Sequence, residues 1–264
     1  MEIFGGGNMA EGMVAAVLRK RLATAREVVV AEPLPPRRQW LEKKFRVPVT
    51  GDNSAAIPGA ELVVVAIKPQ EMAGVLGGLK GKLSSDQLLL SVVAGATLAT
   101  LRQAHPAAVR AMPNINARAG MAVTLWTATQ EVTPEQREMA AAFLSALGRQ
   151  IYTGEEKYLD MATALSGSGP AYVFLFIEAL TDAGVHIGLP RPLAAELAVH
   201  TVSGSAGLAV KTGTPPAQLR EMVVSPGGTT AEALLRLEEG GFRGLITRAV
   251  VAAYEKSQAL GKRG

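Results

Sequence analysis

A glycine-rich turn within the first ten residues most constrains how this chain can fold. Residues 1–4 form a short apolar run, and Gly5, Gly7 and Ala10 then match the pattern G-x-G-x-x-G/A. At a strand-to-helix turn the first glycine makes the turn, the second lets the backbone approach a pyrophosphate, and the small third residue lets helix and strand pack closely. An amphipathic stretch over residues 13–22 and a second apolar run over residues 28–31 follow. This context predicts a dinucleotide-binding domain of the Rossmann type.

Glu32, at the end of the second predicted strand, stands where such a domain selects its cofactor. An acidic residue here accepts hydrogen bonds from the adenosine ribose hydroxyls, favours NADH and repels the 2′-phosphate of NADPH. Arg37 and Arg38 follow a few residues later, and an arginine near this point can instead hold that phosphate. The same two arginines also fit a solvated helix start. The residues therefore favour NADH without excluding NADPH, and Arg37 is kept as a candidate cofactor-binding residue.

Composition and charge exclude several classes of protein. The chain has 264 residues, enough for two domains with cores of their own, and 48% of them are apolar, so it is globular rather than disordered. The net charge is only +4, and there is no long basic tract or nucleic-acid motif. Cysteine is absent, which excludes disulfides and thiolate chemistry. His105, His186 and His200 lack metal-ligand spacing, so no metal site is predicted.

No membrane segment or signal peptide is expected. The longest uncharged stretch, residues 161–177, contains the sequence Ser-Gly-Ser-Gly-Pro at residues 166–170. We expect this interruption to prevent a single membrane-spanning helix. The first ten residues are already part of the nucleotide turn, which leaves no room for a leader. A soluble, cytoplasmic protein is therefore predicted.

The chain changes character near residue 153. Before this point short apolar strands alternate with helical stretches, which predicts a parallel sheet covered by helices on both faces. After it strand signals disappear, and helical segments with prolines at their starts and glycines at their ends follow. These helices are expected at residues 170–188, 190–211, 215–223, 229–239 and 242–260. We therefore predict a dinucleotide-binding domain over residues 1–153 and an all-helical domain over residues 154–264, whose excess apolar surface is buried by dimerisation.

Ligand loops in a sheet of this kind lie at the carboxyl ends of the strands. After the first two, strands are expected near residue 47 and at residues 62–67, 88–93, 108–112 and 121–127. Residues at or after the ends of these strands are candidates for the cofactor site: Asn53, Ala66, Lys68, Pro69, Ala94, Gly95 and Asn114. Lys68 stands out, because an ammonium group beside an apolar strand end needs a partner, such as a cofactor ribose or phosphate or a loop carbonyl.

A second glycine-rich segment, Ser225–Thr230, reads Ser-Pro-Gly-Gly-Thr-Thr. Pro226 fixes a turn, the adjacent glycines let backbone N–H groups approach a ligand, and the two threonines supply an N-cap hydroxyl and a free hydroxyl at the start of a helix. Exposed N–H donors and a helix dipole suit a small carboxylate. Because an ordinary capped turn fits the same residues, this segment alone does not decide the function.

Taken together, these segments resemble pyrroline-5-carboxylate reductase. The resemblance runs in order from about residue 1 to residue 260. The motifs that carry it are Gly5-x-Gly7-Asn8-Met9-Ala10, Lys68-Pro69, Val93-Ala94-Gly95, Met112-Pro113-Asn114, Ser166-Gly167-Ser168-Gly169-Pro170-Ala171-Tyr172 and Ser225-Pro226-Gly227-Gly228-Thr229-Thr230. The last two are highly specific to that family. We expect residues 166–172 to act mainly as a helix start at the core of a dimer.

The resemblance implies that NAD(P)H reduces the C=N bond of 1-pyrroline-5-carboxylate to give L-proline. Asn8 and Met9 join the glycine turn in holding the cofactor, which in this family is commonly NADPH. Ser225, Gly227, Gly228 and Thr229 hold the substrate carboxylate, and Thr230 hydrogen-bonds the ring nitrogen as the catalytic residue. Because a protonated cyclic imine is already electrophilic, no metal or strong general acid is required.

The resemblance also implies a homodimer, formed through the C-terminal helices, with the site between subunits. Dimers of this family commonly assemble into larger rings, often decamers. The chain departs from many relatives at the end of the second strand, where Glu32-Pro33 replaces an Asn-Arg or Ser/Thr-rich turn. That departure favours NADH, whereas the family resemblance favours NADPH.

Two alternatives stay open from the sequence. A β-hydroxyacid dehydrogenase shares the glycine turn and the helical second half, but it needs a lysine on the inter-domain helix, and residues 168–183 contain none. A non-catalytic nucleotide-binding homologue would keep the fold without needing an intact Ser225–Thr230 segment.

Overall fold

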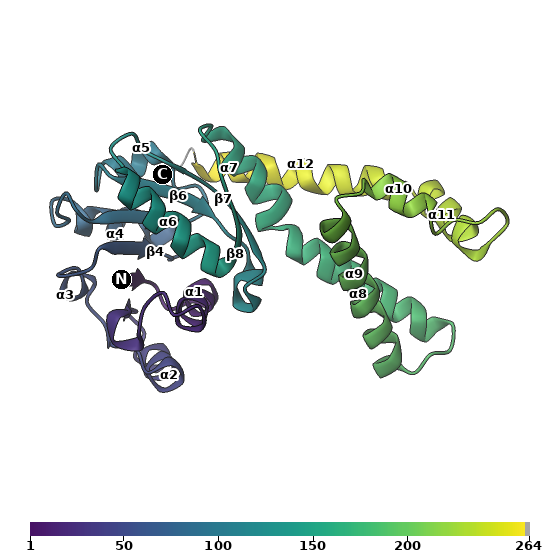
Figure 1. Cartoon of the computed structure of the whole chain (residues 1–264), viewed down its shortest axis with the longest axis horizontal. Helices are drawn as coiled ribbons and strands as arrows, with labels where there is room; N and C mark the ends of the chain where they lie inside the picture. Colours follow the sequence, from purple (N-terminus) through teal and green to yellow (C-terminus); the bar gives the residue numbers. More distant parts are fainter. Residues whose placement is uncertain (262–264) are drawn as a thin grey trace. The chain divides into compact units, whose positions relative to one another are not determined.

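The computed structural model describes residues 1–261 and divides into two compact units (Figure 1). The first unit contains Met1–Ser168 and the segment that begins at Ala252, and the second contains Gly169–Val251. The chain therefore leaves the first unit once and returns to it once. The domain boundary expected between residues 153 and 154 stays a prediction.

An eight-stranded sheet in the order β3-β2-β1-β4-β5-β6-β7-β8 forms the centre of the first unit. Its strands are β1 (Glu2–Phe4), β2 (Val29–Ala31), β3 (Val49–Thr50), β4 (Leu62–Val65), β5 (Leu88–Ser91), β6 (Ala108–Met112), β7 (Ala122–Ala128) and β8 (Gly148–Tyr152). Strands β1 to β6 pair in parallel, and the order 3-2-1-4-5-6 is that of a doubly wound dinucleotide-binding sheet. The predicted fold class is confirmed. A ligand crevice is expected beside β1, where the strand order reverses.

The last two strands differ from the sequence-based prediction. β7 pairs with β6 in the antiparallel direction, because the connection between Met112 and Ala122 is too short for a parallel crossover. β8 was not predicted. It follows helix α6 (Pro134–Leu147) without a break and pairs in parallel with β7, and its sequence Gly-Arg-Gln-Ile-Tyr lacks a clear apolar alternation.

Helices cover both faces of the sheet. α1 (Asn8–Arg19), α2 (Pro35–Phe45) and α6 pack on one face, while α4 (Met72–Leu79) and α5 (Leu98–Arg102) pack on the other (Figure 1). The remaining short elements are α3 (Asn53–Ala56), α7 (Lys157–Ala162) and the 3-10 helices η1 (Ala25–Glu27), η2 (Pro69–Glu71) and η3 (Ile115–Ala119). Along β1, Ile3 joins the core under α1 and Phe4 the core under α4, because successive side chains of a strand point to opposite faces.

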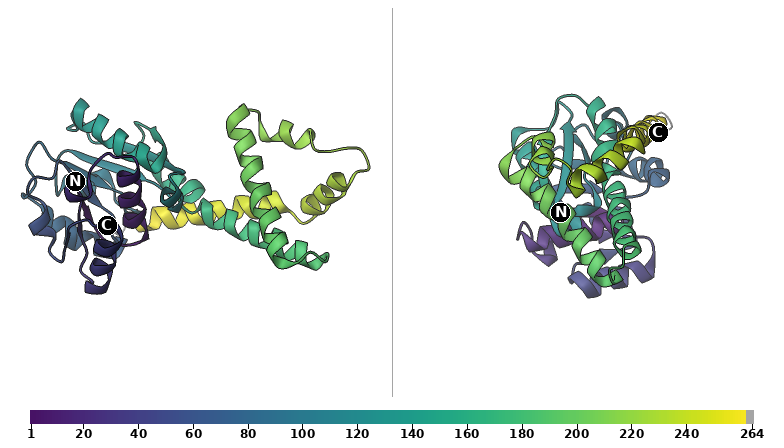
Figure 2. Two further views of the ribbon diagram at one scale, coloured as in Figure 1. Left: turned by 60° about the horizontal axis from the view of Figure 1, so that its bottom comes forward. Right: turned by 90° about the vertical axis from the view of Figure 1, so that its right-hand side faces the viewer.

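The second unit is built from helices. They are α8 (Gly169–His186), α9 (Arg191–Thr212), α10 (Pro216–Glu221), α11 (Thr229–Glu239) and the first part of α12 (Phe242–Gly261), close to the predicted bounds. α8 and α9 pack against each other (Figure 2). A Cβ on Gly184 would lie 2.9 Å from the Cβ of Ala194, so the glycine permits this close approach. The predicted all-helical second half is confirmed.

Much of the apolar surface of the second unit is exposed in the single chain. Phe174 and Leu175 on α8 are 57% and 67% exposed, and Leu197 and Val210 on α9 are 50% and 86% exposed. Within Gly169–Val251 the only buried side chains are those of Pro170, Thr181, Ala194 and Ala198. So many exposed large apolar side chains mark an interaction site.

One expectation about the second half was wrong. The Ser-Gly-Ser-Gly-Pro sequence does not end the helical path, because α7 leads directly into the π-helix Thr163–Gly167, and α8 begins after the single bend residue Ser168. Pro170 is near the start of α8, where its missing N–H group is not needed. The helical stretch Lys157–His186 is therefore long and apolar enough to cross a membrane, judged by length and composition alone. Arg191–Thr212 meets the same criterion. Helices that are covered by a partner chain meet the same criterion.

Buried Arg110 on β6 fixes the chain segments that border the second unit. Its guanidinium pairs with Glu156 at 2.9 Å and with Asp160 at 2.6 Å. Glu156 also accepts a hydrogen bond from the backbone N–H of Leu98 at 2.7 Å, and Asp160 accepts one from the hydroxyl of Ser257 on α12 at 3.3 Å. The segment around α7 and the end of α12 are thereby attached to the sheet.

Candidate functional site

The glycine turn between β1 and α1 has the geometry that the sequence predicts. Gly5 has a φ of +96°, and a Cβ there would lie 2.5 Å from the backbone oxygen of Ala66, at the end of β4. Only glycine suits both this conformation and this space. Gly7 is the N-cap of α1, where no side chain caps the helix, and a Cβ on Gly7 would meet no atom within 4 Å. The start of α1 is therefore open and uncapped, as an anion site requires.

Glu32 holds the glycine turn from the end of β2. Its Oε2 accepts a hydrogen bond from the N–H of Gly6 at 2.7 Å, and its Oε1 accepts one from the N–H of Leu34 at 2.9 Å. A carboxylate accepts about four hydrogen bonds, so each oxygen keeps a lone pair for a ribose hydroxyl. The side chain is only 8% exposed. The residue expected to contact the ribose is thus oriented by two backbone donors.

Arg37 and Arg38 are both engaged with the protein. Arg37 donates from Nε to the carbonyl of Gly6 and from Nη2 to Glu11 at 2.9 Å. Arg38 donates from Nη1 to the carbonyl of Glu32 at 2.7 Å and to the next carbonyl at 2.8 Å. The two arginines therefore brace the glycine turn and the β2–α2 loop.

Glu11, in the first turn of α1, is the centre of a charge cluster that sequence reasoning missed. It pairs with Lys44 at 2.8 Å, Arg37 at 2.9 Å and Arg118 at 3.0 Å. Burial alone would raise the pKa of Glu11, but the hydrogen bonds from Lys44 and Arg37 and the charge of Arg118 outweigh it and hold that pKa below its ordinary value. No local pattern indicates this cluster, because its cations come from α2 and η3.

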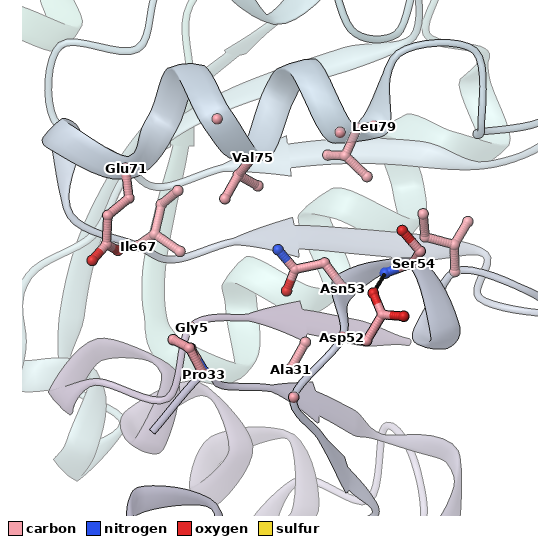
Figure 3. Close-up of a pocket in the computed structure, with 14 residues that line it drawn as sticks. Gly5, Ala31, Pro33, Asp52, Asn53, Ser54, Ile67, Glu71, Val75 and Leu79 are labelled. Atoms are coloured by element: carbon pink, nitrogen blue, oxygen red, sulfur yellow. Dashed lines mark hydrogen bonds between the residues drawn. The ribbon is translucent and has the colours of Figure 1, made fainter. Parts of the chain in front are cut away.

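A cavity of about 640 Å³ lies beside the crevice expected from the strand order. Gly5 and Asn53, both predicted for the cofactor site, line it together with the two neighbours of Glu32, Ala31 and Pro33. Figure 3 shows Val75 and Leu79 of α4 across the cavity from Asn53. The structure therefore gathers the carboxyl ends of β1, β2 and β3 around one pocket.

The α4 side of this cavity was not predicted. Glu71, Gly74, Val75 and Gly78 line it. Gly74 and Gly78 are about one helical turn apart, and a Cβ on either would meet no atom within 4 Å. Because glycine weakens a helix interior, two glycines four residues apart were a usable signal for a helix face kept clear for a ligand.

Lys68 and Pro69, after β4, are placed at the start of η2. Lys68 is exposed, and its ammonium makes no hydrogen bond or ion pair with any residue in the described range 1–261. The protein itself therefore does not supply the partner that the sequence led us to expect. Ala66 packs against Gly5, as described above.

Gly95 and Asn114 each have a structural contact. Gly95, after β5, has a φ of +81°, and a Cβ there would lie 3.2 Å from the backbone nitrogen of Gly261 at the end of α12. Ala94 beside it is half-buried. Asn114 donates from Nδ2 to the carbonyl of Ser166 at 3.0 Å and so holds the π-helix. The roles of these three residues in cofactor binding stay predictions.

Ser225–Gly228 form a tight turn in the second unit. The N–H of Gly228 donates to the carbonyl of Ser225 at 3.0 Å, and Gly227 has a φ of +68°. Proline at the second position and left-handed glycine at the third are the pattern of a type II turn. A Cβ on Gly228 would displace the Oγ of Ser225 and would lie 3.2 Å from the Ser225 carbonyl oxygen, so space is tight at this second glycine, whereas Gly227 is favoured by its conformation.

The N-cap of α11 differs from the prediction, although the bounds of the helix agree with it. Gly228, rather than Thr229, is the N-cap, and no side chain caps the helix. Gly228 has the extended backbone of an N-cap, which makes Thr229 the first helical residue. Thr229 is exposed and Thr230 is half-buried. The uncapped start of α11 therefore leaves its N–H groups for a ligand. Across residues 1–261 no group of three or more His, Asp or Glu side chains is placed to hold a metal ion.

Two protein-family models match the chain. Residues 156–260 match the model described as pyrroline-5-carboxylate reductase dimerisation. Residues 1–95 match the model described as NADP oxidoreductase, coenzyme F420-dependent. The two matches fall on the helical half and on the first strands of the sheet, respectively.

Full-length relatives agree with the family model matched by the helical half. The chain is 43% identical over 263 residues to a pyrroline-5-carboxylate reductase of Synechocystis sp., covering 99% of this chain and 98% of the relative. It is 39% identical to the pyrroline-5-carboxylate reductase of Pisum sativum, with 97% and 94% covered. A solved structure of Plasmodium falciparum pyrroline carboxylate reductase with NADP bound is similar with a TM-score of 0.90 and 31% identity, covering 98% of this chain and 97% of that one.

Proposed function

This chain belongs to the pyrroline-5-carboxylate reductase family, and from that premise we propose which of its residues perform each part of the reaction. It is an NAD(P)H-dependent oxidoreductase that reduces the C=N bond of 1-pyrroline-5-carboxylate to L-proline, the last step of proline biosynthesis. This activity takes precedence over the two alternatives that the sequence left open.

The glycine turn is proposed to hold the cofactor. Gly5, Gly7, Asn8, Met9 and Ala10 would place the pyrophosphate at the uncapped start of α1, and Glu32 would accept hydrogen bonds from the adenosine ribose. The bound reduced nicotinamide supplies the hydride. The other residues proposed to border the cofactor are Arg37, Asn53, Ala66, Lys68, Pro69, Ala94, Gly95 and Asn114.

The uncapped start of α11, directly after the type II turn, is the observation that carries the substrate assignment. We propose that backbone N–H groups near Gly227–Thr229 bind the substrate carboxylate, with Ser225 beside them. A helix N-terminus favours an anion through its dipole and its unpaired N–H groups, so no lysine or arginine is needed there. The rigid turn fixes the carboxylate and thereby orients the ring.

Thr230 is proposed as the catalytic residue. It is the second residue of α11 and is half-buried, so its hydroxyl lies close to the proposed carboxylate site. Its hydrogen bond to the ring nitrogen would orient the imine for hydride addition at the adjacent carbon. Positioning and electrostatics are sufficient for this step, because the protonated imine is already electrophilic.

The helical part of the chain is the dimerisation domain of this family, and it supports a homodimer. The exposed apolar side chains of α8 and α9 are the surface that we expect the partner subunit to cover. We propose further that dimers assemble into a larger ring, as a decamer, and that the protein acts in the cytoplasm.

The decisive test is turnover of Thr230→Ala, followed by absorbance loss of NADH or NADPH with 1-pyrroline-5-carboxylate. We expect kcat to fall about 100- to 1,000-fold, as for loss of one positioned donor, with the melting temperature unchanged. Thr230→Ser should restore most of the rate. Thr247→Ala is the matched control, because the Thr247 hydroxyl bonds only the carbonyl of Arg243 within its own helix. Unchanged turnover of Thr230→Ala would remove this role from Thr230.

A further inference from the structure

We propose that this protein selects NADH and discriminates against the 2′-phosphate of NADPH, and that Glu32 is the specificity-determining residue. The inference rests on the proposed cofactor site and sets this chain apart from the relative whose structure has NADP bound. It is carried by three observations: the fixed position of the Glu32 carboxylate, the charges that line the adjoining cavity, and the contacts of the two nearest arginines.

The Glu32 carboxylate is held in place and cannot easily move aside. Two backbone donors, the N–H groups of Gly6 and Leu34, bind its two oxygens at 2.7 and 2.9 Å. Rotating the side chain away would leave both N–H groups without their acceptor, at a site that is 8% exposed. A ribose with two free hydroxyls can donate to the remaining lone pairs of this carboxylate, whereas a 2′-phosphate cannot.

The charged residues that line the cavity are acidic. Among the described residues around it, Asp52 and Glu71 carry charge, and no lysine or arginine is present. With Glu32 between the lining residues Ala31 and Pro33, three carboxylates lie at or beside the proposed adenosine site. A 2′-phosphate carries nearly two negative charges. It would be repelled by the charged side chains that line the cavity, because all of them are acidic.

Two cations border this cavity, Lys82 and Arg38. Lys82 donates from Nζ to the hydroxyl of Ser54, a lining residue, at 2.8 Å. Nη1 of Arg38 would lie 3.0 Å from a Cβ on Gly51, which lines the cavity. That same Nη1 donates to the carbonyl of Glu32 and to the following carbonyl. Arg37 is likewise bound to the carbonyl of Gly6 and to Glu11. Nη1 of Arg38 and the Nε and Nη2 of Arg37 could bind a phosphate only by giving up contacts that shape the turn.

Binding of ADP-ribose and 2′-phospho-ADP-ribose to the full-length protein tests the inference without turnover. Isothermal titration calorimetry gives both Kd values, and neither probe contains nicotinamide. We expect wild type to bind ADP-ribose at least about 10-fold more tightly. Equal affinity, or tighter binding of the 2′-phosphorylated probe, would overturn the proposal even if no variant folds.

Two variants test whether Glu32 causes the selectivity between the two probes. Glu32→Ser should bring the two Kd values within about 3-fold of each other, mainly by improving the phosphorylated probe. Glu42→Ser, which removes an exposed carboxylate from α2, should leave the ratio as in wild type. Circular dichroism melting checks that Glu32→Ser is folded. An unchanged ratio in folded Glu32→Ser would refute the role of Glu32.

A separate variant tests whether Arg38 binds the 2′-phosphate. If Arg38 held a 2′-phosphate, Arg38→Met would weaken the phosphorylated probe selectively, and this outcome would overturn the proposal. We expect the ratio of the two Kd values to stay at or above that of wild type. If neither probe bound wild type, the cofactor site itself, and the proposed function with it, would fail, which is distinct from the loss of selectivity.

Discussion

Nη2 of Arg110 lies 2.6 Å from Oδ1 of Asp160, in an ion pair where 5% of the arginine side chain and 24% of the aspartate side chain are exposed. The pair joins the sheet to α7, next to the point at which the chain leaves the first unit. A buried guanidinium depends on its partners, because removing one leaves a charge that water reaches poorly.

Asp160→Ala should therefore lower the free energy of unfolding by about 1–3 kcal/mol, since Glu156 alone remains to neutralise Arg110. The matched control is Asp182→Ala, which removes an ion pair with Arg191 in which both side chains are more than half exposed. We expect the control to cost less than about 0.5 kcal/mol. Urea denaturation at fixed protein concentration measures both, and equal costs would contradict the proposed importance of the Arg110 cluster.

The buried, protonated carboxyl group of Glu2 makes the free energy of unfolding decrease as the pH rises. The side chain is fully buried in β1, and within residues 1–261 neither carboxyl oxygen has a hydrogen-bond partner. Burial raises the pKa of Glu2 from 4.5 to about 8. The folded state thus binds this proton more tightly than the unfolded state, so the contribution is complete below pH 4.5 and is lost as the pH rises through about 8.

Glu2→Gln should remove this dependence. Between pH 5 and 8 we expect the unfolding free energy of wild type to decrease relative to the variant by up to roughly 1.4 kcal/mol per pH unit. Thermal melting of both proteins across that range measures the difference, with Glu42→Gln as an exposed control. Parallel curves for wild type and Glu2→Gln would show that Glu2 does not titrate with a raised pKa.

Gly227→Ala tests the substrate turn through its backbone. Alanine at a φ of +68° costs about 1 kcal/mol or more, and relief of that strain would tilt the N–H groups proposed to bind the carboxylate. We expect KM for 1-pyrroline-5-carboxylate to rise about 5- to 10-fold with the Kd for NADH unchanged. Gly213→Ala introduces the same strain at a φ of +66°, at the end of α9. An equal rise of KM in that control would argue against a specific role for the turn.

Leu175→Glu should weaken the dimer. This side chain is 67% exposed in the single chain, and burying a leucine contributes about 1.5–3 kcal/mol, counted twice in a symmetric dimer. A buried carboxylate would add a penalty. Light scattering after size-exclusion chromatography should show smaller species for this variant. Leu34→Glu, at a leucine that is 63% exposed in the first unit, should keep the wild-type mass. If Leu34→Glu disrupted assembly and Leu175→Glu did not, the interface would lie on the first unit.

The sequence predicts well those features that depend on local periodicity and on glycine or proline. The short apolar run at residues 1–4 predicts a buried strand, and β1 has Ile3 and Phe4 in the cores on opposite faces of the sheet. The bounds of α11 agree with the prediction at both ends. The glycine turn and the Ser225–Gly228 turn follow from the same local rules. Asn53 lines the cavity, and its role in cofactor binding stays a prediction.

Features that depend on distant partners were missed or misplaced. β8 is a strand because β7 offers it hydrogen bonds, and its own sequence shows little strand pattern. The charges around Glu11 come from two other elements, α2 and η3. Propensity acts locally, whereas β8 and the Glu11 cluster were decided by tertiary contacts. The N-cap of α11 was misplaced by one residue for a local reason, because the preceding type II turn sets the backbone of Gly228.

Because the end of α12 packs in the first unit, that unit completes its packing only after α12 has been synthesised. Gly95 follows β5, yet the space above its Cα is closed by Leu260 and Gly261, and Ser257 completes the contacts of Asp160. The ribosome makes these residues only after the whole helical unit. Domains tend to fold as they emerge from the ribosome, but here the dinucleotide-binding unit reaches its final packing after the helices that follow it. Nascent chains released before residue 252 would therefore carry a sheet whose edge at Gly95 is uncovered.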